Sequence, residues 1–404
     1  SEAGSSSNNT ATEVPIADQE CRSDPISMLS GEEILPLIDF ELNGLMPIVW
    51  RRLYRSSKIK QNLGLGYGWR HNYSMQLVQK YQEPPKVGPK QPGRYWLELT
   101  DEEGRLHVFD KVKRGQTSYQ LSSGLALVHQ ADGSHTLIKS DDSHWTFTEQ
   151  VTKSITETSS TRQSSRKKKE QPQPTWLLQS ISNNQGQYIQ LNYDDKQRLV
   201  ELSPGPKRGI KLQYNVDNNI IRIAAYYIDE HNKTHVHNNL LANYQYDDSQ
   251  ALIAATNSSG NVERYTYHKQ RVELDLEDAK TAIKPQLSYL LKKRTRSSGF
   301  SHHFEWQGTD ENAQCIKQWG DNDTYQYRFK FFIDERGKVS TSTDSNGNTE
   351  TFIHNEQGLL TAFTNANGHT SYNEYDSAGR KVKAIDCQGN VTEFSYNQQG
   401  QLSL

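Results

Sequence analysis

The chain has 404 residues, a net charge of −2 from 46 basic and 48 acidic residues, and a hydrophobic fraction of 33%. The near balance of charge excludes a protein-wide field that would recruit nucleic acid or an anionic membrane. The hydrophobic fraction is below the roughly 45–50% of ordinary globular domains, while 21 tyrosines exclude a wholly disordered chain. We therefore expect a thin, tyrosine-rich β-structure without a thick aliphatic core.

The first part of the chain predicts a leader followed by a β-rich region. Residues 1–23 are small and polar and predict a flexible leader. Between residues 24 and 151, short apolar or aromatic runs alternate with glycine, proline and asparagine, which is typical of strands and turns. No apolar period of about 3.6 residues lasts long enough to predict a substantial helix.

A basic stretch of low complexity interrupts this pattern. Residues 152–175 are rich in serine, threonine and glutamine and contain the run Arg166-Lys167-Lys168-Lys169. We predict a disordered insertion loop on the surface, because isolated basic runs are usually solvated. The alternative is a docking arm for phosphate-bearing partners, which the balanced net charge disfavours.

From residue 176 to residue 404 the chain contains a repeat. Gly347, Gly368 and Gly389 lie 21 residues apart. A pair stands seven residues after each, and another glycine follows: the pairs are His354-Asn355, Tyr375-Asp376 and Tyr396-Asn397, and the later glycines are Gly358, Gly379 and Gly400. A fixed period of this length predicts an array of stacked units. The last copy breaks off near Leu404, so we expect the array to be incomplete at its C-terminal end.

Elementary chemistry accounts for the residues of one unit. Gly389 and Asn390 can adopt positive φ and form a tight turn. Tyr396 fits the strand that follows, and an Asx side chain such as that of Asp376 can bond the backbone two residues on. Gly400 suits the left-handed position of the second turn. One period is thus two strands and two turns, which must stack on neighbours to be stable.

These residues resemble a known family. Gly368 followed by Tyr375-Asp376 and Gly379-Arg380 resembles the YD repeat of Rhs proteins, which also occurs in teneurins and in the C components of Tc insecticidal toxins. The first part of the chain also resembles the leading motifs of the Rhs family. The residues that carry this resemblance are Asp24-Pro25, Asp39, Trp50-Arg51, Tyr54, Gly66, Gly68 and Trp69. The resemblance covers about residues 24–404.

The resemblance implies an all-β YD-repeat strip of stacked hairpins that spirals into part of a hollow shell, a β-cocoon. In bacterial Rhs effectors this shell encloses a C-terminal toxin that acts on competing cells and is often delivered by type VI secretion. The implied partners are the remaining Rhs repeats, the enclosed toxin domain and a secretion-spike or chaperone protein. Without a signal peptide, we expect synthesis in the bacterial cytoplasm and export as part of an effector.

Two alternatives remain open. An extracellular adhesion or recognition module, of teneurin-like or Tc-toxin C-component type, would favour disulfides and glycosylated sequons such as Asn72-Tyr73-Ser74. The isolated cysteines Cys21, Cys315 and Cys387 predict no disulfide framework.

The second alternative, a carbohydrate-active enzyme on a β-solenoid, would need acidic side chains clustered on one face. No GxSxG, HExxH, Walker or GxGxxG motif occurs, so we expect no catalytic residue and no cofactor, with toxin activity outside this chain.

Three candidate sites each have a simpler interpretation. Some relatives are cut near the equivalent of Asp24-Pro25, although a turn suffices to explain this pair. The histidines His231, His235 and His237 could bind a transition metal, but a solvated loop explains them and we expect no metal. A third candidate is a cluster of aromatic and basic residues, Trp50, Arg51, Arg52, Tyr54, Trp69 and Arg70. Such a cluster could bind single-stranded nucleic acid. Cross-strand packing with arginine stacked on the aromatic rings is the favoured interpretation. We expect neither nucleic-acid binding nor a membrane span.

Overall fold

The structure is a computed structural model that describes residues 14–84, 92–120, 122–150, 173–229, 231, 233–270, 286–397 and 402–403. Over these residues almost all regular structure is β, and the helical segments are single 3₁₀ turns, η2 (Ile16–Asp18), η3 (Ser56–Lys58) and η4 (Asp321–Asp323). The predicted all-β class is confirmed. Most of the predicted basic insertion, residues 152–172, lies outside the described residues.

The chain folds into two compact units, which we describe separately. The first comprises Ser1–Ser74, Glu102–Arg105 and Ile189–Leu404, and the second comprises Met75–Asp101 and Leu106–Tyr188. The sequence predicted a different division, with a β-rich region to residue 151 and an array from residue 176. The second unit is therefore built from the later part of the predicted β-rich region and the first residues of the predicted array.

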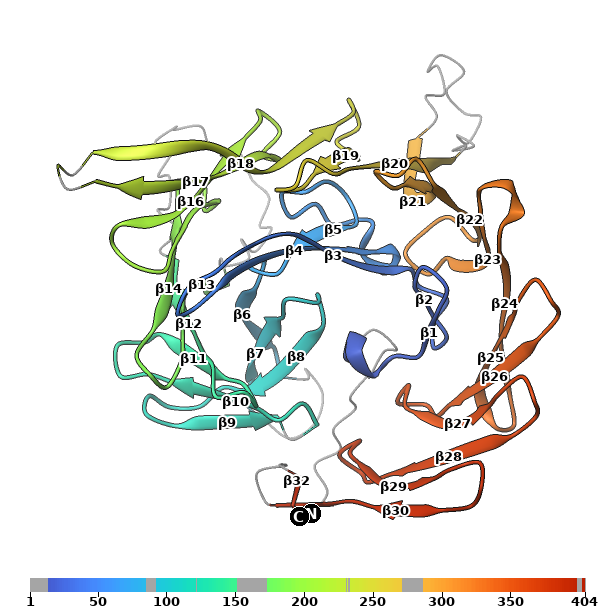
Figure 1. Ribbon diagram of the computed structural model, residues 1–404. Helices are drawn as coiled ribbons and strands as arrows, with labels where there is room; N and C mark the ends of the chain where they lie inside the picture. The colour runs from blue at the N-terminus through green and yellow to red at the C-terminus, as the bar shows by residue number, and fades with distance from the viewer. Residues whose placement is uncertain are drawn as a thin grey trace, which may run out of the picture. The chain divides into compact units, whose positions relative to one another are not determined.

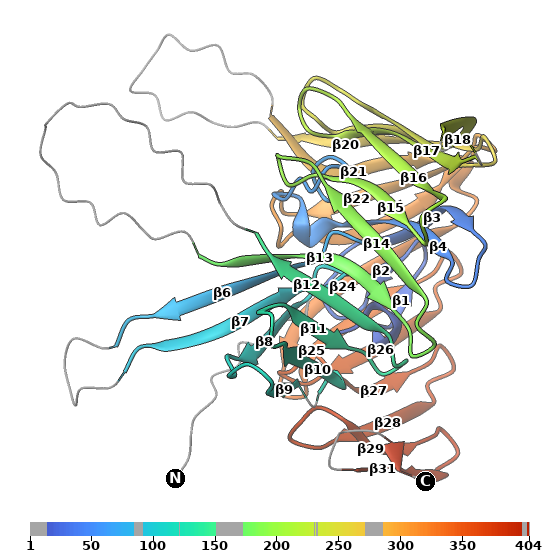
Figure 2. The same cartoon turned by 90° about the vertical axis from the view of Figure 1, so that its left-hand side faces the viewer.

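The second unit is a closed ring of antiparallel strands. Its strands are β6 (Gln76–Gln82), β7 (Arg94–Thr100), β8 (Leu106–Asp110), β9 (Thr117–Gln120), β10 (Leu125–His129), β11 (His135–Ile138), β12 (His144–Glu149) and β13 (Thr175–Ser182). Each lies beside the next, and β13 also pairs with β6, which closes the ring. Figure 2 shows β6 and β7 running side by side. The facing pairs Leu97–Phe109 and Leu127–Leu137 are fully buried and form part of its core.

The first unit contains a long antiparallel strip in which each strand pairs with the next along the chain. Its strands are β14 (Tyr188–Tyr193), β15 (Leu199–Ser203), β16 (Arg208–Tyr214), β17 (Ile220–Ile228), β18 (Thr234–Tyr246), β19 (Leu252–Thr256), β20 (Val262–Gln270), β21 (Gln286–Thr295), β22 (Ser301–Gln307), β23 (Gln314–Gly320), β24 (Gln326–Asp334), β25 (Gly337–Thr343), β26 (Thr349–His354), β27 (Leu360–Thr364), β28 (Thr370–Tyr375), β29 (Lys381–Ile385) and β30 (Val391–Glu393). The predicted strip of stacked hairpins is therefore confirmed.

The N-terminal part of the first unit lies against one face of this strip. It contains β1 (Cys21–Arg22), β2 (Ile26–Ser27), β3 (Ile34–Leu42), β4 (Ile48–Arg55) and β5 (Trp69–His71), of which β3, β4 and β5 form a small sheet. Figure 1 shows the strip, coloured from green to red, curving around β3 to β5 in blue. We call this face of the strip the inner face, and residues 14–74 the N-terminal segment.

Apolar alternation explains why the strip buries its inner face. Leu191, Leu202 and Ile210 are directly opposite one another on neighbouring strands and are nearly inaccessible to solvent. Successive residues of a strand point to opposite faces, so their neighbours Glu201 and Lys211 face outward. Burial of such a row stabilises strands that could not hold together singly.

One expectation needs correction. Residues 14–23 belong to the predicted flexible leader, yet here they contain η2 and β1 and pack on the inner face. Val14 is buried, and Arg22 pairs with Glu350 from β26. The physical reason is a partner more than 300 residues away, which a local reading of composition does not detect. The rest of the predicted leader lies outside the described residues.

Candidate functional site: the braced inner face

The tyrosine of each repeat links neighbouring hairpins. The hydroxyl of Tyr375 donates to the backbone carbonyl of Leu360 at 2.8 Å, and that of Tyr396 donates to the carbonyl of Lys381 at 2.8 Å. The hydroxyls of Tyr267 and Tyr214 make the same bond, and every acceptor lies 15 residues before its donor. The tyrosine of one unit thus caps a backbone group at the start of the preceding strand.

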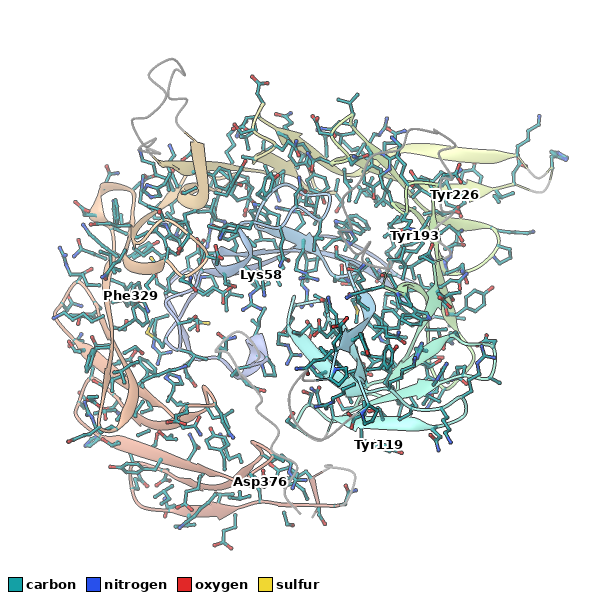
Figure 3. The ribbon with its side chains drawn as sticks, turned by 180° about the vertical axis from the view of Figure 1, so that it is seen from behind. Lys58, Tyr119, Tyr193, Tyr226, Phe329 and Asp376 are labelled. Atoms are coloured by element: carbon teal, nitrogen blue, oxygen red, sulfur yellow. The ribbon has the colours of Figure 1, made fainter. Side chains whose placement is uncertain are left out.

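The aspartate and arginine of the repeat shape its turn. In the turn between β28 and β29, which Figure 3 labels at Asp376, one carboxylate oxygen accepts the amides of Ala378 and Arg380. The other oxygen accepts the Arg380 side chain at 2.7 Å. The Arg380 guanidinium then lies 4.8 Å from the ring centre of Tyr396 in the next unit. The motif therefore closes its own turn with an ion pair and contacts the next unit through a cation–π contact.

The glycines of the repeat occupy the backbone positions that the sequence predicts. Gly347, Gly368, Gly379 and Gly389 have φ between 80° and 87°, in the left-handed region. Side chains with a Cβ adopt this region at a steric cost, which explains the choice of glycine. Gly400 lies outside the described residues.

The N-terminal segment bonds to one strand after another across the inner face. The partners, in order along the strip, are Asn62 with Asn219 and Gln250, Trp50 with Tyr244, Arg52 with Tyr265, Tyr54 with Tyr289, Asp24 with Arg294 and Gln318, Gly31 with Cys315, Met28 with Ser340, and Arg22 with Glu350. These pairs are separated by up to 328 residues in the chain. The segment therefore acts as a brace that fixes many strands of the strip relative to one another.

An ion pair lies at the centre of the brace. The Arg52 guanidinium donates to the Asp39 carboxylate at 2.6 and 2.9 Å, and both side chains are at most 3% exposed. Tyr244 donates its hydroxyl to the same carboxylate and accepts a hydrogen bond from the Trp50 indole at 2.9 Å. Burial and the Asp39 charge raise the pKa of Tyr244, so it stays protonated and can donate.

Aromatic rings surround the Arg52 cation. Its guanidinium lies 5.0 Å from the ring centre of Trp69, 5.5 Å from that of Tyr244 and 5.9 Å from that of Tyr265. The Trp69 indole donates to Tyr267, and Tyr54 donates to the backbone of Tyr289. The predicted packing of arginine on aromatic rings is thus confirmed. Trp50, Tyr54 and Trp69 are at most 1% exposed, which leaves these rings no surface on which a base could stack.

The glycines of the leading motif allow a loop to press on two turns of the strip. Gly66 has φ of 84°, and a Cβ placed there would lie 2.9 Å from the carbonyl oxygen of Gln250. Gly68 has φ of 83°, and its Cβ would lie 2.8 Å from the Tyr54 ring. In the same loop, the Asn62 side chain donates to Asn219 and Gln250. Any larger residue at Gly66 would separate the loop from the strip.

A second buried ion pair was not singled out from the sequence. Arg55 donates to both oxygens of Glu32 at 2.7 Å, with side-chain exposures of 0% and 4%. Arg51, which the sequence did single out, alternates with Arg52 along β4 and is half-buried, paired across the strand with Ile38. Alternation along the strand is the signal that separates the inward Arg52 from Arg51.

Asp24 and Pro25 lie in a firmly held turn between β1 and β2. The buried Gln318 amide accepts from the Asp24 backbone N–H and donates to the Asp24 carbonyl, both at 2.9 Å. Arg294 donates to both oxygens of the Asp24 carboxylate at 2.9 Å. Nearby, burial together with the Asp24 charge raises the pKa of Glu33 well above its usual range.

The sequence also predicts that the chain binds no metal, has no disulfide framework and has no membrane span. Within the described ranges, no group of three or more histidine, cysteine or acidic side chains is close enough to hold a metal ion. Only the exposed His231 of the three weighed histidines has a described side chain. Cys21, Cys315 and Cys387 are all free thiols. No helix in the described part of the chain is long and apolar enough to cross a membrane.

Comparison with known proteins gives two family matches and several structural likenesses. The family described as RHS Repeat matches residues 354–386, and a domain of unknown function (DUF6531) matches residues 23–109. No curated protein matches the chain. The crystal structure of TcdB2–TccC3–Cdc42 is similar with 10% identity and a TM-score of 0.36, over 80% of this chain and 19% of that chain. A Photorhabdus luminescens Tc holotoxin pore is similar with 11% identity and a TM-score of 0.32, over 87% of this chain and 19% of that chain.

The RHS Repeat match coincides with a repeat unit described above. It falls on the unit in which Tyr375, Asp376 and Arg380 make their contacts. The chain therefore contains a YD repeat of the Rhs type at residues 354–386. It spans about a fifth of the length of the solved chains to which it is similar.

Proposed function

We propose that this chain is a wall segment of a shell that encloses a C-terminal toxin domain for delivery to competing cells by type VI secretion. The supporting observation is uninterrupted antiparallel pairing from β14 to β30, with the N-terminal segment bonded across the inner face. Continuous pairing leaves no unpaired strand edges within the wall. The role proposed for this chain is mechanical rather than catalytic, and the toxin activity belongs to another part of the parent protein.

The last strands indicate where the wall would continue. β30 pairs with β29 through Val391 and Ile385, and the short strands β31 (Ser395–Tyr396) and β32 (Leu402–Ser403) begin a further hairpin. We propose that the remaining Rhs repeats add to this edge and that the toxin domain faces the inner side of the completed wall. A secretion-spike or chaperone protein would join the assembly in the bacterial cytoplasm before export.

Protection from protease tests this proposal in the full-length parent protein. If the wall encloses the toxin domain, trypsin spares that domain in the native protein and cuts it when Arg52→Ala weakens the brace. Arg336→Ala is the matched control, because the Arg336–Asp334 pair is exposed to solvent. Cleavage of the toxin domain in the native protein as fast as in Arg52→Ala would contradict enclosure.

Two observations favour the shell over an adhesion module. The Asn72 side chain of the sequon accepts from the Arg51 amide and donates to the Val49 carbonyl, both at 3.0 Å. A glycan on the Asn72 nitrogen would disrupt this arrangement. The free thiols likewise give no support to an extracellular disulfide scaffold.

We also propose that the chain is cut between Asp24 and Pro25. Gln318 donates to the Asp24 carbonyl, which polarises the bond that a water would attack. Hydrolysis adds water to that carbonyl carbon, and the Pro25 nitrogen takes up a proton as it leaves. Intact-mass analysis of the full-length protein would show a fragment beginning at Pro25, and less of it in Gln318→Ala. A single uncut species would refute the proposal.

A further inference from the structure

Residues 14–22, which we call the strap, lie on the inner face of the strip against Glu350, Phe352 and Phe363, three side chains that we call the Arg22 site. The Arg22 guanidinium bonds to Glu350 and lies 4.7 Å from the ring centre of Phe352 and 5.5 Å from that of Phe363. A Cβ built on Gly358 would lie 3.5 Å from Val14, so the start of the strap packs on the turn between β26 and β27. The Arg22 site thus combines one carboxylate with two aromatic rings, which suits an arginine side chain.

The ion pair that holds the strap is more exposed than the ion pair at the centre of the brace. Arg22 and Glu350 are 24% and 28% exposed, whereas Arg52 and Asp39 are 2% and 3% exposed. Solvent therefore screens the Arg22 pair far more than the Arg52 pair. In addition, β1 is two residues long, is half-buried, and pairs only with the short strand β2 among the described strands.

A joint lies where the strap meets the anchored part of the segment. Ser23 has φ of 62°, a left-handed conformation that is sterically costly for a residue with a Cβ. The next residue, Asp24, is fixed through its backbone by Gln318 and through its carboxylate by Arg294. Rotation at Ser23 would therefore move the strap and leave Asp24 and the later residues in place.

We propose that the strap is a latch that opens about Ser23 and so switches the Arg22 site between a covered and an open state. Phe352 is fully buried with the strap in place, and the Arg22 guanidinium lies over its ring. The closed strap thus occupies this site with a side chain of the chain itself. The open site takes an arginine on an extended peptide, since that is the chemistry of its present occupant.

Hydrogen–deuterium exchange on the whole chain tests the latch. The amides of Ile16, Asp18 and Gln19 are hydrogen-bonded and report on the strap. Arg22→Ala should speed their exchange by about tenfold or more and leave β3 and β4 unchanged, because only a local opening becomes easier. Lys60→Ala, which removes an exposed ion pair with Glu311, should change neither region. A single common rate for strap, β3 and β4, in native protein and in Arg22→Ala alike, would overturn the proposal.

A peptide tests whether the open Arg22 site binds arginine. A labelled peptide with the sequence of residues 14–24 should bind the Arg22→Ala chain with saturable fluorescence anisotropy. The double variant Arg22→Ala, Glu350→Ala should bind it at least tenfold more weakly, because the carboxylate is gone. Equal signals from the two variants, or none from either, would contradict an arginine-selective site.

Discussion

The guanidinium of Arg52 and the carboxylate of Asp39 meet through two hydrogen bonds inside the brace, with Tyr244 bonded to the same carboxylate. Removing one partner of a buried pair leaves an uncompensated charge, which typically costs about 3–5 kcal/mol. We therefore expect Arg52→Ala and Asp39→Ala each to lower the free energy of unfolding by about that amount, measured in urea. The double change Asp39→Leu, Arg52→Met should recover much of the loss, because it buries no charge.

The exposed Arg336–Asp334 pair provides the control for this experiment. Arg336 is 52% exposed, and solvent screening leaves such pairs little contribution to stability. Arg336→Ala should therefore change stability little. A loss in Arg336→Ala equal to that in Arg52→Ala would show that burial does not decide the strength of these pairs.

The tyrosine link between hairpins predicts a smaller effect. Tyr375→Phe removes the hydrogen bond to the Leu360 carbonyl and should cost about 1 kcal/mol. Tyr372, on the same strand and 50% exposed, is the matched site, and Tyr372→Phe should stay within about 0.5 kcal/mol. Urea denaturation of both variants gives the comparison, and equal values would remove the structural role assigned to the repeat tyrosine.

Alanine substitutions at three glycines distinguish the stability cost of backbone strain from that of a steric clash. Gly368 has φ of 81° with open space around it, so Gly368→Ala should cost about 1 kcal/mol through backbone strain alone. Gly66 has a similar φ but would place its Cβ against the Gln250 carbonyl, so Gly66→Ala should cost more. Gly205 has open space and no positive φ, so Gly205→Ala should be neutral or slightly stabilising. Melting temperatures in any other order would contradict this assignment.

Buried histidines predict acid sensitivity. Burial and the Arg70 charge lower the pKa of His71 to about 3, so the folded chain keeps this ring neutral. The unfolded chain binds a proton near pH 6.5, so the contribution of His71 to stability is complete above that pH and declines as the pH falls toward 3. Between pH 6.5 and pH 5 the loss should be about 2 kcal/mol.

His71→Phe isolates this contribution, because the ring that stacks on Trp50 is kept and its charge is removed. The variant should lose less stability than the native chain between pH 6.5 and pH 5. An identical pH profile for both proteins would show that His71 is not held neutral.

Local turn chemistry was predictable, and long-range bracing was not. The turns at Gly368 and Gly389 follow from nearby Asx and glycine residues, whose conformations depend on a few adjacent atoms. By contrast, the bonds from Asp24 to Gln318 and from Trp50 to Tyr244 join residues about 200 to 300 positions apart. No periodic pattern in the sequence predicts which of these distant residues bond to each other.

The irregular part of the repeat also has a structural explanation. The Tyr246 hydroxyl donates to the carbonyl of Ile220, 26 residues earlier, instead of to one 15 residues earlier as for Tyr375. The extra eleven residues match the length of the stretch 229–239, which contains the histidines His231, His235 and His237. They extend the hairpin of β17 and β18, so the next unit resumes the normal offset at Tyr267.

An experimental density map of the full-length parent protein would test the wall most directly. Our account predicts that a strand following this chain pairs with β30, that the N-terminal segment crosses the inner face with Arg52 against Asp39, and that the downstream domain lies on that same side. A downstream domain on the outer side, or β30 left unpaired at the surface, would contradict it.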